Sequence, residues 1–334
     1  MTINCPKELP KKKSSWYVFL AGPIQGAPDW QNNMPEMKDV VWLSPRRKSY
    51  NDFNKEEQIE WETKCMTLAD IILFWIPKEA EHIEGRQYAQ TTRTEFGEYL
   101  ALGKKIITAI DPSIPGRYYL EMKAKQYHQE LPSSSLEEAL SKLEKYINAE
   151  SASTNKFFTA DTHFGSQRAL ELSKRPYETV NDMDRAMIRN WNKVVHPNDI
   201  VYHLGDLGET WPVQYLNGKI ILVFGNYERK ELEKDPNLIE TLKNSGIDEV
   251  YTDPITFDDY ILAHEPLLAK ESNNQNKKTV FCLFGHIHGR QKVKKFGIDV
   301  GVDANNFTPM KLSDVEFFRN AIEQGYYDEE VWSR

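Results

Sequence analysis

The sequence predicts an α/β protein of two domains, and three observations lead to this prediction. In the first half, short apolar runs alternate with helical segments, which is typical of a parallel sheet with helices on both faces. In the second half, five apolar runs each give way to polar residues, as strands do when their ends build a site. A small, polar stretch at 148–155 has a linker composition, so we expect domains at 1–150 and 151–334.

The first strand is expected at Trp16–Leu20, which Gly22 and Pro23 end in a tight turn. Lys11–Lys13 precede it as in a signal peptide, but the apolar run is too short for one. It therefore indicates a buried strand. The later segments alternate in type: a short strand at 42–47 with a basic end, a strand within 68–77 opened by Asp70, a helix from 91 closed by Gly103, a strand at 106–110 and a helix from 134 to about 147.

Four segments, FLAGPI, WLSPRR, ADIILFWIP and TRTEFGEYLALGK, resemble the nucleoside 2-deoxyribosyltransferase-like family over about 16–110. The resemblance implies a Rossmann- or flavodoxin-like parallel sheet with flanking helices. It also implies an enzyme that cleaves or transfers the N-glycosidic bond of a nucleoside or nucleotide. A carboxylate can form an ester with the sugar through an oxocarbenium-like transition state, and water or a second base then resolves the ester.

The resemblance assigns roles to particular residues. Glu95 would be the nucleophile that attacks C1′ of the sugar, Asp70 would orient the sugar hydroxyls, and the turn of Gly22 and Pro23 would lie under the substrate. At a helix start, the helix dipole and backbone N–H donors would keep Glu95 ionised. In the alternative interpretation, Glu95 completes a capping box that begins at Thr92.

Arg46 and Arg47 form the basic end of the second strand. Guanidinium groups bind phosphate bidentately, so this pair would grip a 5′-phosphate and favour nucleotides over nucleosides. The alternative is a pair of solvated surface arginines. Glu98 lies one helical turn after Glu95 and is the obvious competitor for the role of nucleophile.

Metal-ligand-type residues end the strand-like runs of the second half. The runs are 156–160, 200–204, 220–224, 261–263 and 280–284, and the residues that follow them are Asp161, His163, Asp206, Asn226, His264, His286 and His288. Two residues at i and i+2 of an extended segment face the same side, so paired members can reach the same ions. This set can hold two divalent metals with one shared carboxylate. Each residue alone would be an ordinary cap or a satisfied polar group, and the ordered series favours the metal site.

The series resembles the calcineurin-like metallophosphoesterase family, whose blocks are D-x-H, G-D, G-N-H-[DE], a lone His and G-H-x-H, over about 157–318. The resemblance implies a four-layer α/β/β/α sandwich and hydrolysis of a phosphomonoester or phosphodiester. Its ligands would divide into two sets that share a bridging Asp206: Asp161, His163, Asp206 and His288 for one ion, and Asp206, Asn226, His264 and His286 for the other. Mn²⁺ is the expected metal, with Fe, Ni²⁺ and Zn²⁺ as alternatives.

One residue departs from that family's pattern. Tyr227 follows Asn226, where the family has a His that stabilises the transition state and protonates the leaving oxygen. A tyrosine, with a reference pKa near ~10, is a weaker acid than imidazolium. The resemblance therefore leaves the leaving-group chemistry open. His196 and His203 are interpreted as structural, with His203 half-buried and bonded to the backbone.

Composition limits the partners and the compartment. The net charge of -8 disfavours non-specific binding to long nucleic acid, and no apolar run approaches the ~20 residues of a membrane span. Three cysteines without motif spacing indicate reduced thiols in a cytoplasmic protein. The expected partner is a small nucleoside or nucleotide, and assembly into a homo-oligomer is left open.

The two halves together predict a bifunctional nucleotide-processing enzyme, in which one domain acts on an N-glycosidic bond and the other on a phosphoester. A nucleotide second messenger or a dinucleotide such as NAD would suit both chemistries. Two alternatives stay open. In the first, the N-terminal domain is a non-catalytic nucleotide sensor that regulates the phosphoesterase. In the second, the N-terminal domain is a glycosidase or NADase, and Tyr227 marks a decayed phosphoesterase that binds metal structurally.

Overall fold

The computed structural model describes residues 1–9, 15–49, 53–267 and 281–325. Lys11–Lys13 and Val280 lie outside the described residues. The chain divides into two compact units, the first ending at Ser153 and the second beginning at Thr154. No helix of the described part is long and apolar enough to cross a membrane.

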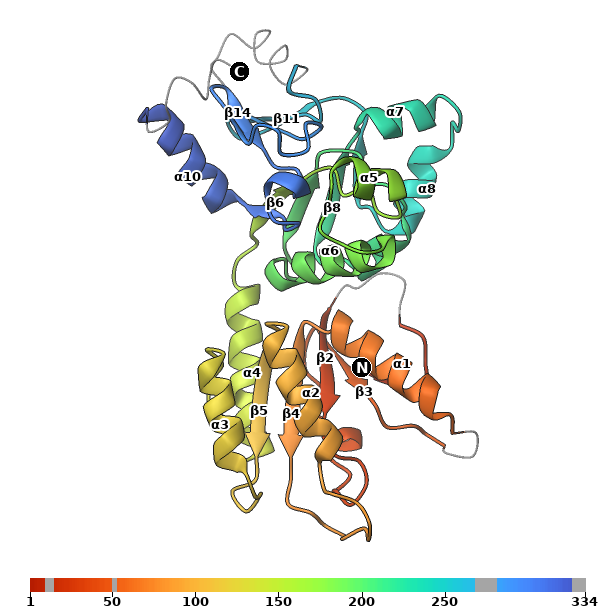
Figure 1. Ribbon diagram of the computed structural model, residues 1–334, viewed down its shortest axis with the longest axis vertical. Coiled ribbons are helices and arrows are strands. Elements are labelled where there is room, and N and C mark those ends of the chain that lie inside the picture. The colour runs from red at the N-terminus through yellow and green to blue at the C-terminus, as the bar shows by residue number, and fades with distance from the viewer. Residues whose placement is uncertain (10–14, 50–52, 268–280, 326–334) are drawn as a thin grey trace. The chain divides into compact units, whose positions relative to one another are not determined.

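The first unit is built on one parallel sheet of five strands (Figure 1). The strand order is β1-β3-β2-β4-β5, with bounds β1 (Thr2–Asn4), β2 (Trp16–Ala21), β3 (Val40–Ser44), β4 (Ile71–Ile76) and β5 (Lys105–Ile110). Apart from the edge strand β1, this is the flavodoxin-like order. The predicted parallel sheet is confirmed, whereas β1 was not predicted, because its three residues leave no periodic signal.

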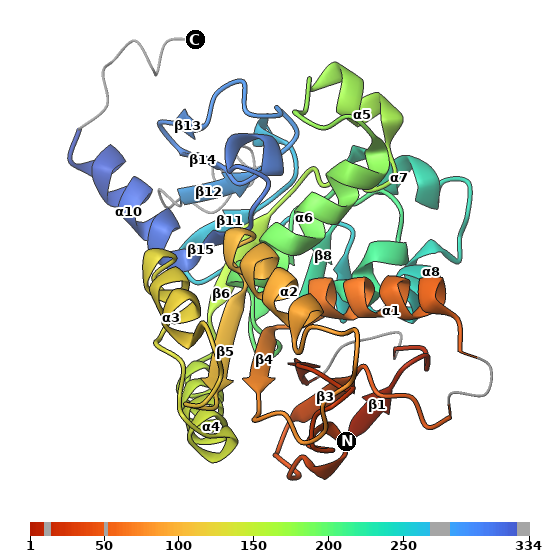
Figure 2. The same ribbon diagram turned by 60° about the horizontal axis from the view of Figure 1, so that its bottom comes forward.

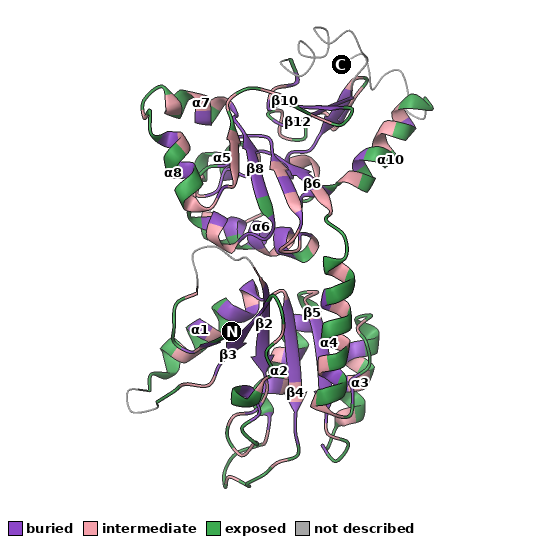
Figure 3. Cartoon of the chain, turned by 180° about the vertical axis from the view of Figure 1, so that it is seen from behind, coloured by how far each residue is buried: buried purple, intermediate pink, exposed green. Residues whose placement is uncertain are grey.

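Helices cover both faces of this sheet, as the turned view in Figure 2 shows. The helices are α1 (Lys55–Leu68), α2 (Gln90–Ala101), α3 (Arg117–Gln126) and α4 (Leu136–Ser151), and a short 3-10 helix, η1 (Gln31–Asn33), precedes β3. Apolar side chains of α1, α2 and α3 pack in one core on one face, and those of α4 pack in a second core on the other. The strands between the two cores are almost wholly buried (Figure 3).

The strand order reverses between β2 and β4, whose carboxyl ends are followed by Gly22 and Pro77. Open parallel sheets bind their ligands outside such a reversal point. The backbone here is tightly packed, because a Cβ on Gly22 would lie 2.3 Å from the carbonyl oxygen of Trp75 and 2.8 Å from the Trp30 ring. Only glycine fits between these two strand ends.

The end of the first unit differs from the predicted linker. Helix α4 continues to Ser151, so half of the stretch expected to be a linker is helical. That stretch has neither glycine nor proline to stop the helix, and Trp16 Nε1 donates a hydrogen bond of 3.1 Å to Ser151 Oγ in its last turn. The non-helical part shortens to a few residues after Ser151.

The second unit contains two five-stranded sheets. The first has the order β15-β6-β7-β8-β9, with β6 (Lys156–Thr159), β7 (Ile200–His203), β8 (Lys219–Val223) and β9 (Glu249–Tyr251) parallel and β15 (Met310–Lys311) antiparallel. The second has the order β10-β11-β12-β14-β13, in which β11 (Tyr260–Leu262), β12 (Phe281–Phe284) and β14 (Gly297–Asp299) are parallel and β10 (Ile255–Phe257) and β13 (Val293–Lys294) are antiparallel.

The two sheets share one apolar core, to which Phe158, Leu204 and Val223 contribute from the first and Leu262 and Leu283 from the second. The described helical segments of this unit include α5 (Gln167–Leu172), α6 (Val180–Val194), η2 (Trp211–Tyr215), α7 (Asn226–Leu232), α8 (Leu238–Ser245), η3 (Val302–Ala304) and α10 (Leu312–Glu323). Helix α10 contributes to the core between the sheets.

The fourth layer of the predicted sandwich is not found among the described residues. On its far side the second sheet carries a small cluster that includes Ile261, Ala263, Cys282 and Phe284, and no described helix packs against this cluster. The expectation of helices outside both sheets is therefore not met by the described part of the chain.

Candidate functional site

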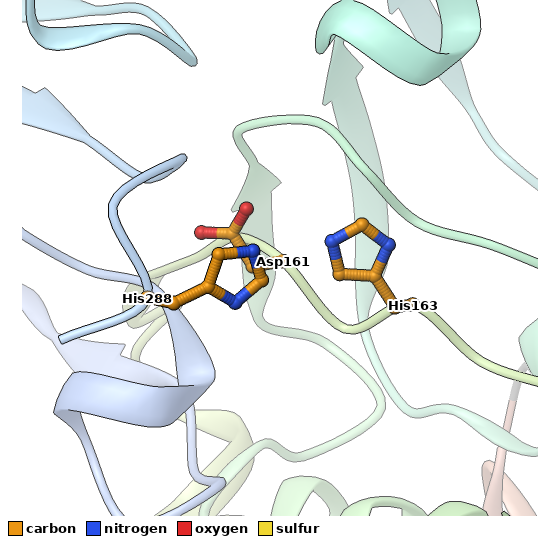
Figure 4. Close-up of side chains that lie close together, drawn as sticks. All are labelled: Asp161, His163 and His288. Atoms are coloured by element: carbon orange, nitrogen blue, oxygen red, sulfur yellow. The ribbon is translucent and has the colours of Figure 1, made fainter. Parts of the chain in front are cut away.

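The structure brings all seven predicted metal-ligand residues together in the second unit. They follow the carboxyl ends of β6, β7 and β8 in one sheet and of β11 and β12 in the other. One group of ligand atoms within 4.8 Å of one another comes from Asp161, His163 and His288, and these side chains lie close together in Figure 4. A second such group comes from Asp161, Asp206 and His264.

The backbone at these residues is in an unusual conformation. Five of the seven residues lie in the left-handed region of backbone conformation, which residues other than glycine rarely adopt. They are Asp161 (φ 58°), His163 (46°), Asp206 (55°), His286 (73°) and His288 (49°). Such conformations cost free energy, persist where the surroundings enforce them and gather at functional sites. The strand ends are therefore shaped to aim side chains inward rather than to continue the sheets.

Asp206 lies between the two groups of ligand atoms. Its Oδ2 is 3.5 Å from Nε2 of His163 and 3.4 Å from Nε2 of His264. Its Oδ1 accepts a hydrogen bond of 3.0 Å from the backbone N–H of Tyr227. This position suits the bridging role implied by the sequence, although Asp161 is the residue that both groups of ligand atoms have in common.

Glu228 is a supporting residue that the sequence analysis missed. Its buried carboxylate accepts backbone hydrogen bonds from Asp206 (2.9 Å), Leu207 (2.8 Å) and Gly225 (2.8 Å). It thereby ties the loop after β7 to the first turn of α7. The sequence does contain a signal for this role, because an acidic residue in the first turn of a helix is well placed to accept hydrogen bonds from backbone N–H groups.

The remaining ligands converge on Asn226. His264 donates from Nδ1 to the carbonyl oxygen of Leu204 at 2.7 Å, which leaves Nε2 facing Asn226 Oδ1 at 3.0 Å. His286 Nδ1 lies 3.2 Å from the same Asn226 oxygen and 3.3 Å from His264 Nε2. Two ring nitrogens and one amide oxygen therefore gather around one point, which is the donor set expected for the second ion.

The electrostatics of the cluster fit bound cations. Asp161 Oδ1 and His163 Nε2 are buried and have no hydrogen-bond partner within the described residues. Burial raises the pKa of Asp161 to about 7 and lowers the pKa of His163 to about 4. Burial alone would lower the pKa of His264, but the hydrogen bond to Asp206 and the charges of Asp161 and Asp206 raise it to about 9. A cation would give the unpaired atoms the partner that they lack.

A buried arginine supports the Asp161 and His288 side of the cluster. Arg175 donates to the carbonyl oxygens of Asp161 (2.6 Å) and Thr162 (2.8 Å) and to both carboxylate oxygens of Asp303 (2.9 Å each). Asp303 in turn accepts a hydrogen bond of 2.7 Å from Nδ1 of His288. Neither residue was predicted from the sequence, although Asp303 follows β14 as the predicted ligands follow their strands.

His203 is structural, but its environment differs from the expectation. It is fully buried rather than half-buried, and its Nε2 bonds to the hydroxyl of Thr162 at 2.9 Å instead of to the backbone. Thr162 Oγ1 donates onward to the carbonyl oxygen of Leu207 at 2.8 Å. Because burial lowers the pKa of His203 to about 3, the ring is neutral and serves as a spacer behind the cluster.

A shallow pocket of about 170 Å³ opens onto the cluster. Besides ligand residues, its lining includes Arg168, Arg290, Leu172 and Tyr227. The Tyr227 side chain is exposed, and its ring stands edge-on to His163 at 5.2 Å between centroids. Both guanidinium groups are without an acidic partner among the described residues, so a phosphate and its substituent would meet positive charge at the mouth of the pocket.

In the first unit, Glu95 lies inside helix α2 rather than at its start. The helix begins at Gln90 with Ala89 as its N-cap and no side-chain cap. The capping box proposed as an alternative is therefore wrong, because Thr92 already lies within the first turn. Phe96 packs against Phe74 of β4 in an edge-to-face contact at 5.3 Å, so Glu95 stands at the side of the helix.

The ionisation state expected for Glu95 is also wrong. Burial, and then the negative charges of Glu62 on α1 and of Glu98, raise the pKa of Glu95 to about 8. Burial also raises the pKa of Glu62, which accepts a hydrogen bond of 2.7 Å from Gln58. The helix dipole acts mainly on the first turn, so it does not keep the Glu95 carboxylate charged at neutral pH.

The other residues predicted for this unit lie at two different edges of the sheet. Gly22 and Pro23 follow the carboxyl end of β2, whereas Asp70 precedes the amino end of β4 and accepts a hydrogen bond of 2.7 Å from the backbone of Tyr17. At ~3.3 Å per residue, the length of β4 separates these edges by ~20 Å. The structure therefore does not bring Asp70 to the Gly22–Pro23 turn.

Arg46 and Arg47 form neither a pair that grips one phosphate nor a pair of solvated surface arginines. Arg46 forms an ion pair of 3.0 Å with Asp29 and donates at 2.8 Å to Gln31, beside the Gly22–Pro23 turn. Arg47 turns away, to Gln58 at 2.8 Å and to a salt bridge with Glu57. Arg46 lies near the expected substrate site, but its charge is already paired with Asp29. Arg47 links the end of β3 to α1.

Comparison with known families covers the first unit. Residues 15–113 match the family described as "Nucleoside 2-deoxyribosyltransferase like". This segment is therefore a nucleoside 2-deoxyribosyltransferase-like domain, which confirms that part of the sequence prediction. The phosphoesterase resemblance of the second unit stays a prediction that depends on the residues and geometry described above.

The proteins similar to this chain include the following two. The uncharacterized protein MJ1445 of Methanocaldococcus jannaschii is 26% identical over 171 residues, which cover 47% of this chain and 86% of that protein. The protein of unknown function AQ665 from Aquifex aeolicus, whose crystal structure is known, is 19% identical with a TM-score of 0.39, over 49% of this chain and 99% of that one. Neither name states an activity.

Proposed function

We propose that the protein is a bifunctional nucleotide-processing enzyme. The second unit would hydrolyse a phosphoester with two divalent metals, and the first would cleave or transfer an N-glycosidic bond. The observation that carries the phosphoesterase proposal is the convergence of seven potential ligands from five strands, two of them with buried, unpartnered ligand atoms. Most buried polar atoms in proteins have a hydrogen-bond partner, and bound metal would supply one to both of these.

In this proposal the ligands form the two sets implied by the sequence, with Asp206 common to both. Mn²⁺ is the proposed metal, and Fe, Ni²⁺ or Zn²⁺ would suit the same oxygen and nitrogen donors. Bound metals would supply Lewis acidity and a nucleophile from water. The protein's own part is to bind the phosphate: Arg168 and Arg290 attract the anion, and Tyr227 and Leu172 contact its substituent.

For the first unit, the family similarity and Glu95 support glycosyl transfer on a small nucleoside or nucleotide. The ionised Glu95 carboxylate would attack C1′ as the bond to the base breaks, and water or a second base would then take the sugar from the ester. The raised pKa of Glu95 supports a catalytic role for this carboxyl group rather than a role in a salt bridge, because the charged carboxylate destabilises the fold.

A non-catalytic sensor is the second candidate for the first unit. It is favoured by the distance between Asp70 and the Gly22–Pro23 turn, because the sugar-orienting residue and the turn expected under the substrate cannot contact one ligand. The interpretation of the second unit as a decayed phosphoesterase keeps the metal ligands and depends on Tyr227, so it predicts bound metal without hydrolysis of a chromogenic phosphodiester. A second messenger or a dinucleotide such as NAD remains the substrate class that suits both units.

Substitution of the proposed bridging ligand tests the phosphoesterase. Asp206→Asn keeps the volume but removes the charge and one strong ligand, so it should abolish metal-dependent hydrolysis of a chromogenic phosphodiester and lower the bound Mn²⁺ measured by elemental analysis. Asp182→Asn, an exposed change in α6, is the matched control. Full activity of Asp206→Asn would contradict the assignment.

A further inference from the structure

We propose that Arg175 and Asp303 are positioning residues that act mainly on one of the two metal positions, the one formed by Asp161, His163 and His288. This inference rests on the proposed metal centre. Neither residue is a ligand. They act by fixing the backbone and the ring that present the ligands.

The first step concerns the Asp161 loop. The Arg175 side chain is fully buried, and it donates to the carbonyl oxygens of both Asp161 and Thr162. Asp161 and His163 both have positive φ angles, so the loop between them is strained and needs outside support. Two charge-assisted hydrogen bonds from one rigid guanidinium supply that support.

The second step concerns the His288 ring. Asp303 Oδ2 lies 2.7 Å from His288 Nδ1, so the ring donates from Nδ1 and its Nε2 is left to bind metal. Carboxylates that accept from the second nitrogen of a ligating histidine fix its tautomer and its orientation. Asp303 is itself held by two bonds of 2.9 Å from Arg175. One ion pair therefore connects the loop after β6 with the loop after β12.

The third step is selectivity. Three of the four ligands at the other position have separate supports: the Leu204 carbonyl for His264, the first turn of α7 for Asn226, and Glu228 for the loop of Asp206. The fourth, His286, donates its backbone N–H to Asp161 Oδ2 at 2.8 Å. No hydrogen bond or ion pair recorded among the described residues links Arg175 or Asp303 to the first three of these supports. Loss of the pair should therefore weaken the first position far more than the second.

The test is the number of Mn²⁺ ions bound by the full-length protein, measured by isothermal titration calorimetry and by the electron paramagnetic resonance of bound Mn²⁺. Wild type should bind two ions with a spin-coupled signal. Asp303→Asn preserves volume but loses the charge that pairs with Arg175 and His288. It should weaken one position by about 10–100-fold and show the signal of an isolated ion.

Arg175→Lys is the second variant, because a lysine keeps the charge but cannot make the same forked contacts. It should show the same selective loss, and it keeps the test decisive if Asp303→Asn fails to fold. Arg319→Ala, which removes another paired arginine on α10, is the control and should bind two ions as wild type does.

Three results would count against the account in different ways. Unchanged affinity at both positions in the variants that fold would overturn the positioning role. Equal weakening at both positions would also overturn it, since it would indicate a general structural role. A wild-type protein that binds no metal would instead refute the proposed metal centre itself.

Discussion

At the residue scale, Tyr227 is the position where this chain departs from its resemblance to phosphoesterases. Its backbone N–H holds Asp206, and its exposed ring faces His163 at the pocket. If a weak acid at this position limits protonation of the leaving group, Tyr227→His should speed hydrolysis of alkyl phosphoesters. It should leave p-nitrophenyl esters almost unchanged, because their leaving group needs no proton. The measurement is a comparison of kcat/KM for the two substrate classes. An equal effect of the substitution on both classes would show that Tyr227 does not lie at the leaving group.

Glu95 is the second residue whose chemistry can be tested. Its pKa is about 8 in the folded protein against an ordinary value of 4.5, so between these pH values the folded state binds more protons than the unfolded state. Stability should therefore fall as pH rises from about 4.5 to about 8, and Glu95→Gln should remove that fall. We expect the variant to have a higher Tm than wild type at pH 8 and an equal one near pH 4.5, and to release no base.

Wild-type base release should rise with pH to about 8, because the nucleophile must be ionised. Glu98→Gln is the matched control, since Glu98 is exposed and one turn away. Base release that survives in Glu95→Gln but vanishes in Glu98→Gln would show that the register is wrong.

At the element scale, the sheet strands carrying site residues could be predicted from sequence because each is a short apolar run ending in a polar residue. The ligands Asp161, His264 and His288 were found in this way. Arg175 and Asp303 were not, because neither sits in a spaced pair and their ion pair joins residues 128 positions apart. The start of α2 was misjudged, since Ala89 has no capping side chain that a sequence could reveal.

Close packing between the strand ends gives a further prediction. A Cβ on Gly285, which directly follows β12, would lie 2.5 Å from Asp161 Oδ2 and 2.5 Å from Ala160 Cβ. Gly285→Ala should therefore displace Asp161 and lower Mn²⁺ affinity in a calorimetric titration, by about 10-fold or more. Gly97→Ala is the control, because a Cβ there meets nothing within 4 Å and should stabilise helix α2 slightly. Wild-type affinity in Gly285→Ala would mean that the loop has room to adjust.

At the scale of the whole molecule, the chain consists of two compact units, each with its own core and its own candidate site. The cysteines Cys5, Cys65 and Cys282 are buried and form no disulfide among the described residues, and the reduced thiols and the cytoplasmic location stay predictions. Because each unit has its own core and its own candidate site, each proposed activity should tolerate loss of the other. Whether the two units act in sequence on one nucleotide then depends on the substrates that each accepts, and not on residues that they share.

The most direct test is to incubate the protein with Mn²⁺ and a panel of nucleotides that includes NAD, and to measure free base and phosphoester cleavage separately. The account predicts that wild type forms both products from at least one compound. Asp206→Asn should then lose only phosphoester cleavage, and Glu95→Gln should lose only base release. The central claim would be contradicted if wild type, with Mn²⁺ bound, cleaved no phosphoester in any of these compounds.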